Sequence, residues 1–147
     1  MIKKLLNPST DRADLILRIA LGIVFFAHGS QKIFGWFGGF GWTGTLGFFQ
    51  QAMGIPPFLA GLSFLAEFVG GVLILLGLLT RPAALAIAVT ILVAGLKVGL
   101  PNGFFLDSNG PNNGIEYVFV LFLLAIYFVI KGSGRISLDS LLSKRNG

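Results

Sequence analysis

Four long hydrophobic runs make up most of the chain, and segments rich in glycine, proline or asparagine separate them. A helix needs roughly 20 apolar residues to cross about 30 Å of hydrocarbon, because each residue adds about 1.5 Å of rise. Runs of this length predict membrane spans rather than the helices of a soluble core. The predicted spans cover residues 15–34, 58–79, 82–100 and 115–131. We therefore expect the 147 residues to form a single all-α membrane domain, a four-helix bundle.

Prolines mark where two of these spans begin. Pro56 and Pro57 break the chain before the second span, and Pro82 opens the third, where the first helical turn tolerates proline. Before the fourth span, either of two neighbouring asparagines, Asn112 or Asn113, is expected to act as the helix cap. The first span follows two lysines, as a cleaved signal peptide would, but it is long and lacks a small-x-small cleavage site, which argues against this reading.

Composition supports the membrane assignment and removes several kinds of chemistry. The chain is 54% hydrophobic and 12% charged, whereas soluble domains carry roughly 25% charged residues. It has no cysteine, which excludes a disulfide framework, an iron–sulfur cluster and Cys-x-x-Cys redox chemistry. His28 is its single histidine, so this chain alone cannot supply the several axial ligands of a haem–copper or bis-histidine haem site.

Basic residues lie unevenly around the predicted spans. Connections 35–57 and 101–114 contain no lysine or arginine. Because cytoplasmic loops of membrane proteins carry an excess of both, we expect cytoplasmic termini and two external connections. The net charge of +5 is then a topology signal, and we expect no nucleic-acid partner, since the basic residues form no continuous stripe. Those assigned to the cytoplasmic side are Lys3, Lys4, Arg12, Arg81, Lys131, Arg135, Lys144 and Arg145.

The first external connection is rich in aromatics and glycine, and a second amphipathic segment follows the last span. Indole rings suit the headgroup interface, so the first segment is interpreted as an interfacial anchor, with a lid over a ligand site as the alternative. Residues 136–143 are expected to form a short interfacial helix. The aromatic residues concerned are Trp36, Phe37, Phe40, Trp42, Phe48 and Phe49.

Six ionisable residues fall within or at the ends of the predicted spans. A charge near the bilayer centre costs at least about 3 kcal/mol, so such groups pair, snorkel or line a wet cavity. Counting helix rise from the cytoplasmic ends puts His28 at about 20 Å and Glu67 at about 18 Å. Glu67 has apolar or small residues on both sides and must be protonated, paired or wet. The six residues are Arg18, His28, Lys32, Glu67, Lys97 and Glu116.

Each of the other charges also has a simple structural interpretation. Lys32 and Lys97 either join the network or snorkel to the outer headgroups. Glu116 is either a network member or a favourable charge at a helix N-terminus. Arg18 is shallow enough to snorkel to inner-leaflet phosphates. His28 is the best-placed partner of Glu67, and a metal site using both with Glu116 would lack any recognisable ligand spacing.

Two glycine pairs at heptad spacing predict close helix packing. Gly22 and Gly29 lie in the first span, and Gly70 and Gly77 lie in the second. Small residues at such intervals let helix backbones approach in lipid.

Four motifs, taken in order, resemble the DoxX family of small membrane proteins. The first motif is RIALG at 18–22 followed by HGSQK at 28–32, and the second is EFVGG at 67–71 followed by GLLTR at 77–81. The third is NGIE at 113–116, and the fourth is GSGRISLD at 132–139. The fourth motif has a serine where the family commonly has proline. The resemblance runs from about residue 14 to residue 139. It implies a four-helix protein of a bacterial or archaeal cytoplasmic (inner) membrane. Family members are described as subunits of a terminal quinol oxidase or of a thiosulfate:quinone oxidoreductase, or are tied to redox stress.

The resemblance favours a redox-associated protein, acting as an oxidoreductase subunit or accessory, that binds a quinone-like molecule within the bundle. No cofactor motif is evident. Glu67 and His28 would form a proton relay, and Lys32 or Lys97 would stabilise a developing oxyanion. Arg18 and Glu116 are further candidate ligand-binding residues. Expected partners are the lipid bilayer and either further copies of the chain or a redox subunit.

Two other functions remain open at this stage. In the first, the chain is a non-catalytic scaffold or assembly subunit, and its charges specify helix pairing. In the second, it is a small transporter or proton pathway, which an acidic residue at mid-depth would suit but which would need an oligomer.

Overall fold

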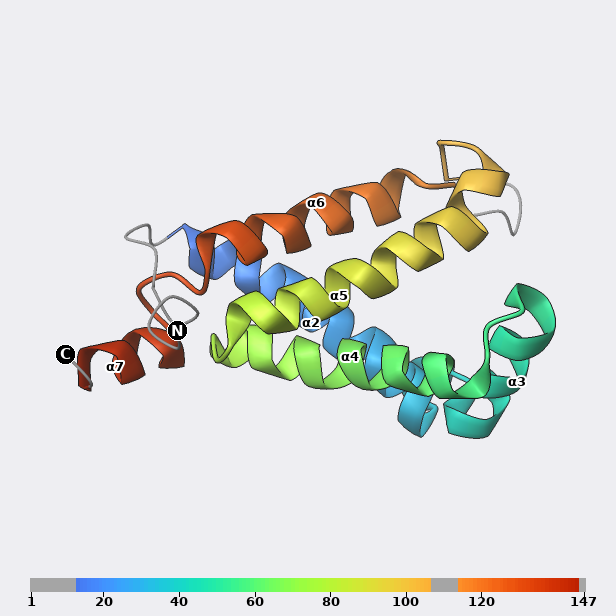
Figure 1. Cartoon of the computed structure of the whole chain (residues 1–147), viewed down its shortest axis with the longest axis horizontal. Coiled ribbons are helices and arrows are strands. Elements are labelled where there is room, and N and C mark those ends of the chain that lie inside the picture. Colours follow the sequence, from blue (N-terminus) through green and yellow to red (C-terminus); the bar gives the residue numbers. More distant parts are fainter. Residues whose placement is uncertain (1–12, 107–113, 146–147) are drawn as a thin grey trace.

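The computed structural model describes residues 13–106 and 114–145, and every regular element in these ranges is a helix. In Figure 1 the four longer helices run lengthwise, with α7 at one end of the molecule and α3 at the other. The α-helices are α2 (Asp14–Phe34), α3 (Gly41–Met53), α4 (Pro57–Leu76), α5 (Thr80–Ala94), α6 (Glu116–Lys131) and α7 (Leu138–Arg145). Shorter helical turns are η1 (Trp36–Gly38), η2 (Gly95–Gly99) and η3 (Leu100–Asn102).

Helices occupy all four predicted runs, and three of them meet the length and hydropathy of a membrane span. These three are α2, α4 and the continuous helical segment from Thr80 to Asn102. Within that segment η2 is a π-helical turn. α6 has 16 residues, about 24 Å of rise, and is therefore shorter than the hydrocarbon core.

Among the described residues, α2 and α4 form the most extensive contact between two helices, and glycines let their backbones approach each other. A Cβ built on Gly29 would lie 2.4 Å from the backbone nitrogen of Phe68, and one on Gly71 would lie 2.4 Å from that of Phe26. A Cβ on Gly22 would overlap the side chain of Leu75. Main-chain contact of this kind supplies the packing that stabilises helix pairs in lipid.

The second predicted glycine pair has two separate roles instead of one. Gly70 faces α5, where Ile87 packs on it. Gly77 ends α4 with φ 64°, a left-handed conformation that favours glycine. A Cβ there would lie 2.5 Å from that of Ser137. Gly71, next to the predicted pair, is the residue that contacts α2.

The buried core lies mainly where α5 packs against α4 and α6. Small residues on α5 (Ala83, Ala84 and Ala88) let it approach both neighbours, and the large side chains Ile87 and Phe128 fill the space between them. Many large apolar side chains on the outer faces of the helices are exposed. An apolar exterior of this extent fits a lipid-facing surface.

The aromatic connection, predicted to be an external loop, is largely helical. It contains η1 and the 13-residue helix α3. Gly35 and Gly54 flank the segment with φ of 74° and 64°, and this positive φ lets the backbone end one helix and turn toward the next. The predicted cap at Asn112 or Asn113 lies outside the described residues.

A helix also forms close to the predicted interfacial segment, beginning two residues later at Leu138. Its first turn is more buried than a purely interfacial helix would be, because Ser137, Asp139 and Ser140 are buried against the rest of the molecule. α7 is therefore tied to the bundle and does not merely lie on a membrane surface.

Candidate functional site

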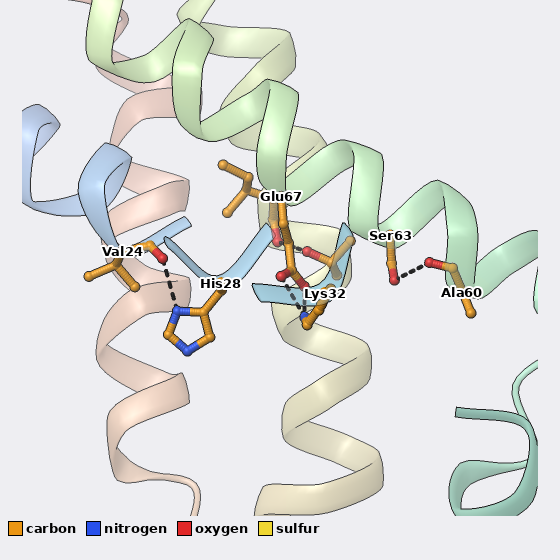
Figure 2. A network of polar contacts seen from close by, with 8 residues as sticks. Val24, His28, Lys32, Ala60, Ser63 and Glu67 are labelled. Atoms are coloured by element: carbon orange, nitrogen blue, oxygen red, sulfur yellow. Dashed lines mark hydrogen bonds and ion pairs between the residues drawn. The ribbon is translucent and has the colours of Figure 1, made fainter. Parts of the chain in front are cut away.

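An ion pair joins α2 to α4 inside the bundle. The Lys32 Nζ lies 2.5 Å from both carboxylate oxygens of Glu67, and Figure 2 shows the two side chains pointing at each other from their helices. Only 19% of the Lys32 side chain and 9% of the Glu67 side chain are exposed. Burial of these charges is favourable only because each neutralises the other.

Aromatic rings enclose the ammonium end of this pair. The Lys32 Nζ lies 5.6 Å from the ring centroid of Phe49 on α3 and 6.0 Å from that of Phe64 on α4. These rings meet edge to face, and Trp42 also makes an edge-to-face contact with Phe64. The rings add a cation–π attraction. α3 therefore helps to hold the ion pair.

His28 lies one helical turn before Lys32 but does not pair with Glu67. Its Nδ1 donates to the carbonyl oxygen of Val24, 2.9 Å away, because a carbonyl can only accept (Figure 2). With Nδ1 as the donor, Nε2 is the ring nitrogen left to accept a hydrogen bond or a proton. The expectation that His28 is the partner of Glu67 is thus corrected: the longer side chain of Lys32 reaches the carboxylate, and the ring is bound to its own helix.

A large cavity of about 660 Å³ opens beside the ion pair. Its volume falls within the range typical of small-molecule sites. α3, the Gly54–Pro56 linker, α4 and α5 supply mainly apolar walls. The charged residues on its walls are Lys32, Glu67 and Lys97. The lining thus combines an extended apolar surface with a few hydrogen-bonding groups.

A small cavity of about 100 Å³ lies next to the same pair, between α2, α5 and α6. Its polar lining residues are His28, Lys32, Glu67, Thr90 and Tyr117. The two cavities share Lys32, Glu67, Thr90 and Ala94 on their walls. The ion pair therefore faces both spaces.

Several residues of this site gave no signal in the sequence. Thr90 looks like an ordinary small residue of a membrane helix, and its hydroxyl donates to the carbonyl of Ile87. Tyr117 stands at the start of α6, where interfacial tyrosines are common. Phe49 was recognised only as one of many aromatics. Their positions depend on which helices are neighbours, and hydrophobic periodicity does not specify that.

Two predicted site residues lie away from both cavities. Arg18 is only 3% exposed, so the expectation that it snorkels to phosphates is wrong. Its guanidinium donates to the carbonyl oxygens of Ser133 and Ile136. Glu116 accepts a hydrogen bond of 2.7 Å from the backbone N–H of Leu106. It therefore holds the preceding connection and does not join the charge network.

The segment containing the GSGRISLD motif closes the α7 end of the molecule. The carboxylate of Asp139 accepts hydrogen bonds from the backbone N–H groups of Leu79 (2.8 Å) and Thr80 (3.2 Å). It thereby caps α5 from a distant part of the chain, as a carboxylate at a helix N-terminus does. The Asp139 N–H donates in turn to the carbonyl of Gly77. We call this arrangement of Arg18 and Asp139 the terminal clamp.

No three histidine, aspartate or glutamate side chains come together within residues 13–106 and 114–145. Glu116 in particular accepts a hydrogen bond from the Leu106 N–H and does not line the small cavity, which His28 and Glu67 share.

Comparison with known proteins places this arrangement in a family. The DoxX family description matches residues 13–100, which contain both members of the ion pair. The chain belongs to the DoxX family. This confirms the resemblance drawn from its sequence motifs.

Bacterial relatives match nearly the whole chain. The Bacillus subtilis protein named "Putative oxidoreductase CatD" is 33% identical over 144 residues, which cover 97% of each chain. The Escherichia coli "Inner membrane protein YqjF" is 34% identical over 139 residues, 92% of this chain and 95% of the relative. An uncharacterized membrane protein of Mycobacterium tuberculosis is 32% identical over 151 residues, 97% of this chain and 88% of its own length. No solved structure matches.

Proposed function

We propose that this DoxX-family membrane protein binds a quinone-like lipophilic molecule in the large cavity, with the polar head of the ligand at the Lys32–Glu67 pair. The observation that carries the proposal is a mainly apolar cavity of about 660 Å³ with a buried ion pair on its wall. A quinone needs an apolar space for its ring and tail, and polar groups for its carbonyl oxygens.

The chemistry of the pair fits both forms of such a ligand. The Lys32 ammonium donates hydrogen bonds and stabilises negative charge developing on a carbonyl oxygen. The Glu67 carboxylate accepts a proton from a quinol hydroxyl. Lys97 adds a third charged group on the wall of the same cavity. The pair thus offers one donor and one proton acceptor to the same ligand head.

We further propose that the chain acts with another redox protein, as a subunit or accessory, or as an oligomer of itself. The support is chemical: the chain has no cysteine and one histidine, and the polar groups of the site handle protons rather than electrons. The relative named CatD carries the word oxidoreductase in its name.

The membrane arrangement is part of the proposal. We infer that α6 is the fourth span and that both termini lie on the cytoplasmic side of a bacterial or archaeal inner membrane. Arg81 and Lys131 lie at the α7 end, where the Arg81 guanidinium donates to the carbonyl of Ile130. The excess of basic residues at that end supports a cytoplasmic location.

The binding proposal is tested by titrating the purified full-length chain in lipid nanodiscs with decylubiquinone. Trp36 and Trp42 are the two tryptophans of the chain, and Trp42 packs against Phe64 near the cavity, so a bound quinone should quench their fluorescence. Glu67→Gln should weaken binding by about tenfold or more, as expected for a lost charge-assisted hydrogen bond.

The chain offers a matched control for this titration. Glu116 is its other glutamate and lies outside both cavities, so Glu116→Gln should bind like the parent protein. Saturable quenching that both variants share would contradict the assignment of the site. Loss of stability in Glu67→Gln, without saturable quenching in the parent protein, would favour the scaffold function.

A further inference from the structure

The ion pair separates two spaces with different linings. The large cavity is bounded mainly by apolar side chains of α3, α4 and α5. The small cavity also has apolar walls, but His28 and Tyr117 line it beside the pair and do not line the large cavity. Both cavities reach Glu67. A ligand in the large cavity would therefore leave the other side of the carboxylate facing the small one.

The size and lining of the small cavity suit water. A water molecule needs roughly 10–15 Å³ of such space and two to four polar partners, and the cavity measures about 100 Å³. Hydroxyl, imidazole, ammonium and carboxylate groups line it. The volume is smaller than the roughly 150 Å³ of an apolar cavity that binds benzene, so it suits a few waters better than a quinone ring.

We propose that the small cavity is a hydrated chamber through which Glu67 exchanges protons with His28. Its role as a proton route for the ligand rests on the proposed function above, but its hydration does not. In the proposed step the ligand O–H bond breaks and the proton passes to a carboxylate oxygen of Glu67. It then passes through water to Nε2 of His28, which is free to accept because Nδ1 donates to Val24. No electron is transferred in this step.

Few other titratable groups face this route. α2 supplies His28 and Lys32, α4 supplies Glu67, and α6 supplies Tyr117. Lys97 lines the large cavity only, and α3 has no titratable residue. His28 lines the small cavity and not the large one, so a proton that reaches its ring lies away from the ligand.

Hydration can be measured without any ligand. In the Glu116→Gln background Glu67 is the only glutamate, so ¹³C-glutamate labelling in bilayers reports on it alone. Water-to-protein magnetisation transfer should reach Glu67 rapidly. Val118→Phe fills the small cavity and should abolish this fast transfer, whereas the matched Val89→Phe fills the large cavity and should preserve it. The proposal is overturned if the parent protein shows no magnetisation transfer from water to Glu67. It is also overturned if the transfer is lost only in Val89→Phe, or is lost equally in Val89→Phe and Val118→Phe.

Ligand measurements separate this proposal from the binding proposal. Val89→Phe should weaken decylubiquinone binding by about tenfold or more, as a steric change in an apolar pocket does, and Val118→Phe should not. His28→Ala should slow proton release on decylubiquinol binding by about 100-fold, the scale of a lost proton-transfer group, at unchanged affinity. Unchanged release in His28→Ala overturns its role. Absence of decylubiquinone binding, with Glu67 still in contact with water, would refute the binding proposal and leave the hydrated chamber standing.

Discussion

At the scale of single residues, the Lys32–Glu67 pair is the feature on which the site depends. Removing two charges from water costs several kcal/mol for each ion, and only close pairing with further contacts offsets this. The two 2.5 Å contacts and the rings of Phe49 and Phe64 provide that compensation. A ligand head that hydrogen-bonds to either group would exchange one favourable contact for another.

Removing one member of the ion pair should lower the unfolding free energy more than removing both members. Lys32→Met leaves Glu67 buried without its partner, and we expect a loss of roughly 3–5 kcal/mol in unfolding free energy. The double variant Lys32→Met/Glu67→Met should recover most of it, because no lone charge remains. Chemical unfolding in detergent micelles measures both. Equal stability of the single and double variants would show that the pair is not held as described.

The sequence identified Glu67 as the residue that needs a partner, but it did not identify the partner. Depth along a helix follows from residue counting, and His28 and Lys32 both lie near the required depth. Which side chain meets the carboxylate depends on how α2 is rotated against α4. The main-chain contacts of Gly29 and Gly71 determine that rotation, and a single sequence contains no direct measure of it.

At the scale of elements, the α2–α4 contact is expected to tolerate no side chain at its centre. Gly29→Ala would place a Cβ 2.4 Å from the backbone of Phe68, so the helices must separate. We expect destabilisation of about 1–3 kcal/mol or more, measured by thermal unfolding. The matched control is Gly47→Ala on α3, where nothing lies within 4 Å, and it should be neutral or stabilising by up to about 1 kcal/mol.

The terminal clamp gives a second prediction for the elements. Asp139→Ala removes the acceptor for the N–H groups of Leu79 and Thr80, and a lost helix cap costs about 0.5–2 kcal/mol. Asp139→Asn should retain most of the stability, because asparagine caps as well as aspartate. Limited proteolysis after Gly132 should accelerate in the alanine variant first. Faster cleavage in the asparagine variant than in the alanine variant would argue against the cap.

The helices within the four hydrophobic runs were predictable, because the length of an apolar run is enough to predict a membrane helix and its approximate position. α3 was missed, since a segment dense in glycine and aromatics has low helix propensity, and packing of Phe49 and Trp42 on α4 stabilises it instead. The structural roles of Arg18 and Asp139 were also missed. Buried charges at helix ends, joined across more than 100 residues in the case of Arg18 and Ser133, leave no local pattern.

At the scale of the whole molecule, orientation is open to direct measurement. The absence of cysteine allows single cysteines to be introduced without a background. Ser143→Cys on α7 should react with a membrane-impermeant maleimide only after the inner membrane is opened. Thr43→Cys, at the α3 end, should react in intact spheroplasts. The reverse labelling pattern would show that the topology is the opposite of the one proposed. Reaction of both cysteine variants in intact spheroplasts would show that α6 or another helix does not cross the membrane.

The terminal clamp and the candidate ligand site lie toward opposite ends of the molecule. The α7 end carries the terminal clamp, which joins α2, α5 and the last segment through main-chain hydrogen bonds. The α3 end carries the ion pair and the wall of the large cavity. In the proposed function, the ligand would bind near the α3 end, away from the terminal clamp.

The central claim is that a quinone-like ligand occupies the large cavity, and photolabelling tests it most directly. An azidoquinone is cross-linked to the full chain in nanodiscs, and the labelled peptides are mapped by mass spectrometry. The account predicts labels within residues 49–67 and 86–97, the segments that contain nearly all the residues lining the cavity. Excess decylubiquinone should remove these labels. Labels confined to outward-facing residues such as Val120 and Leu123, and insensitive to competitor, would contradict it.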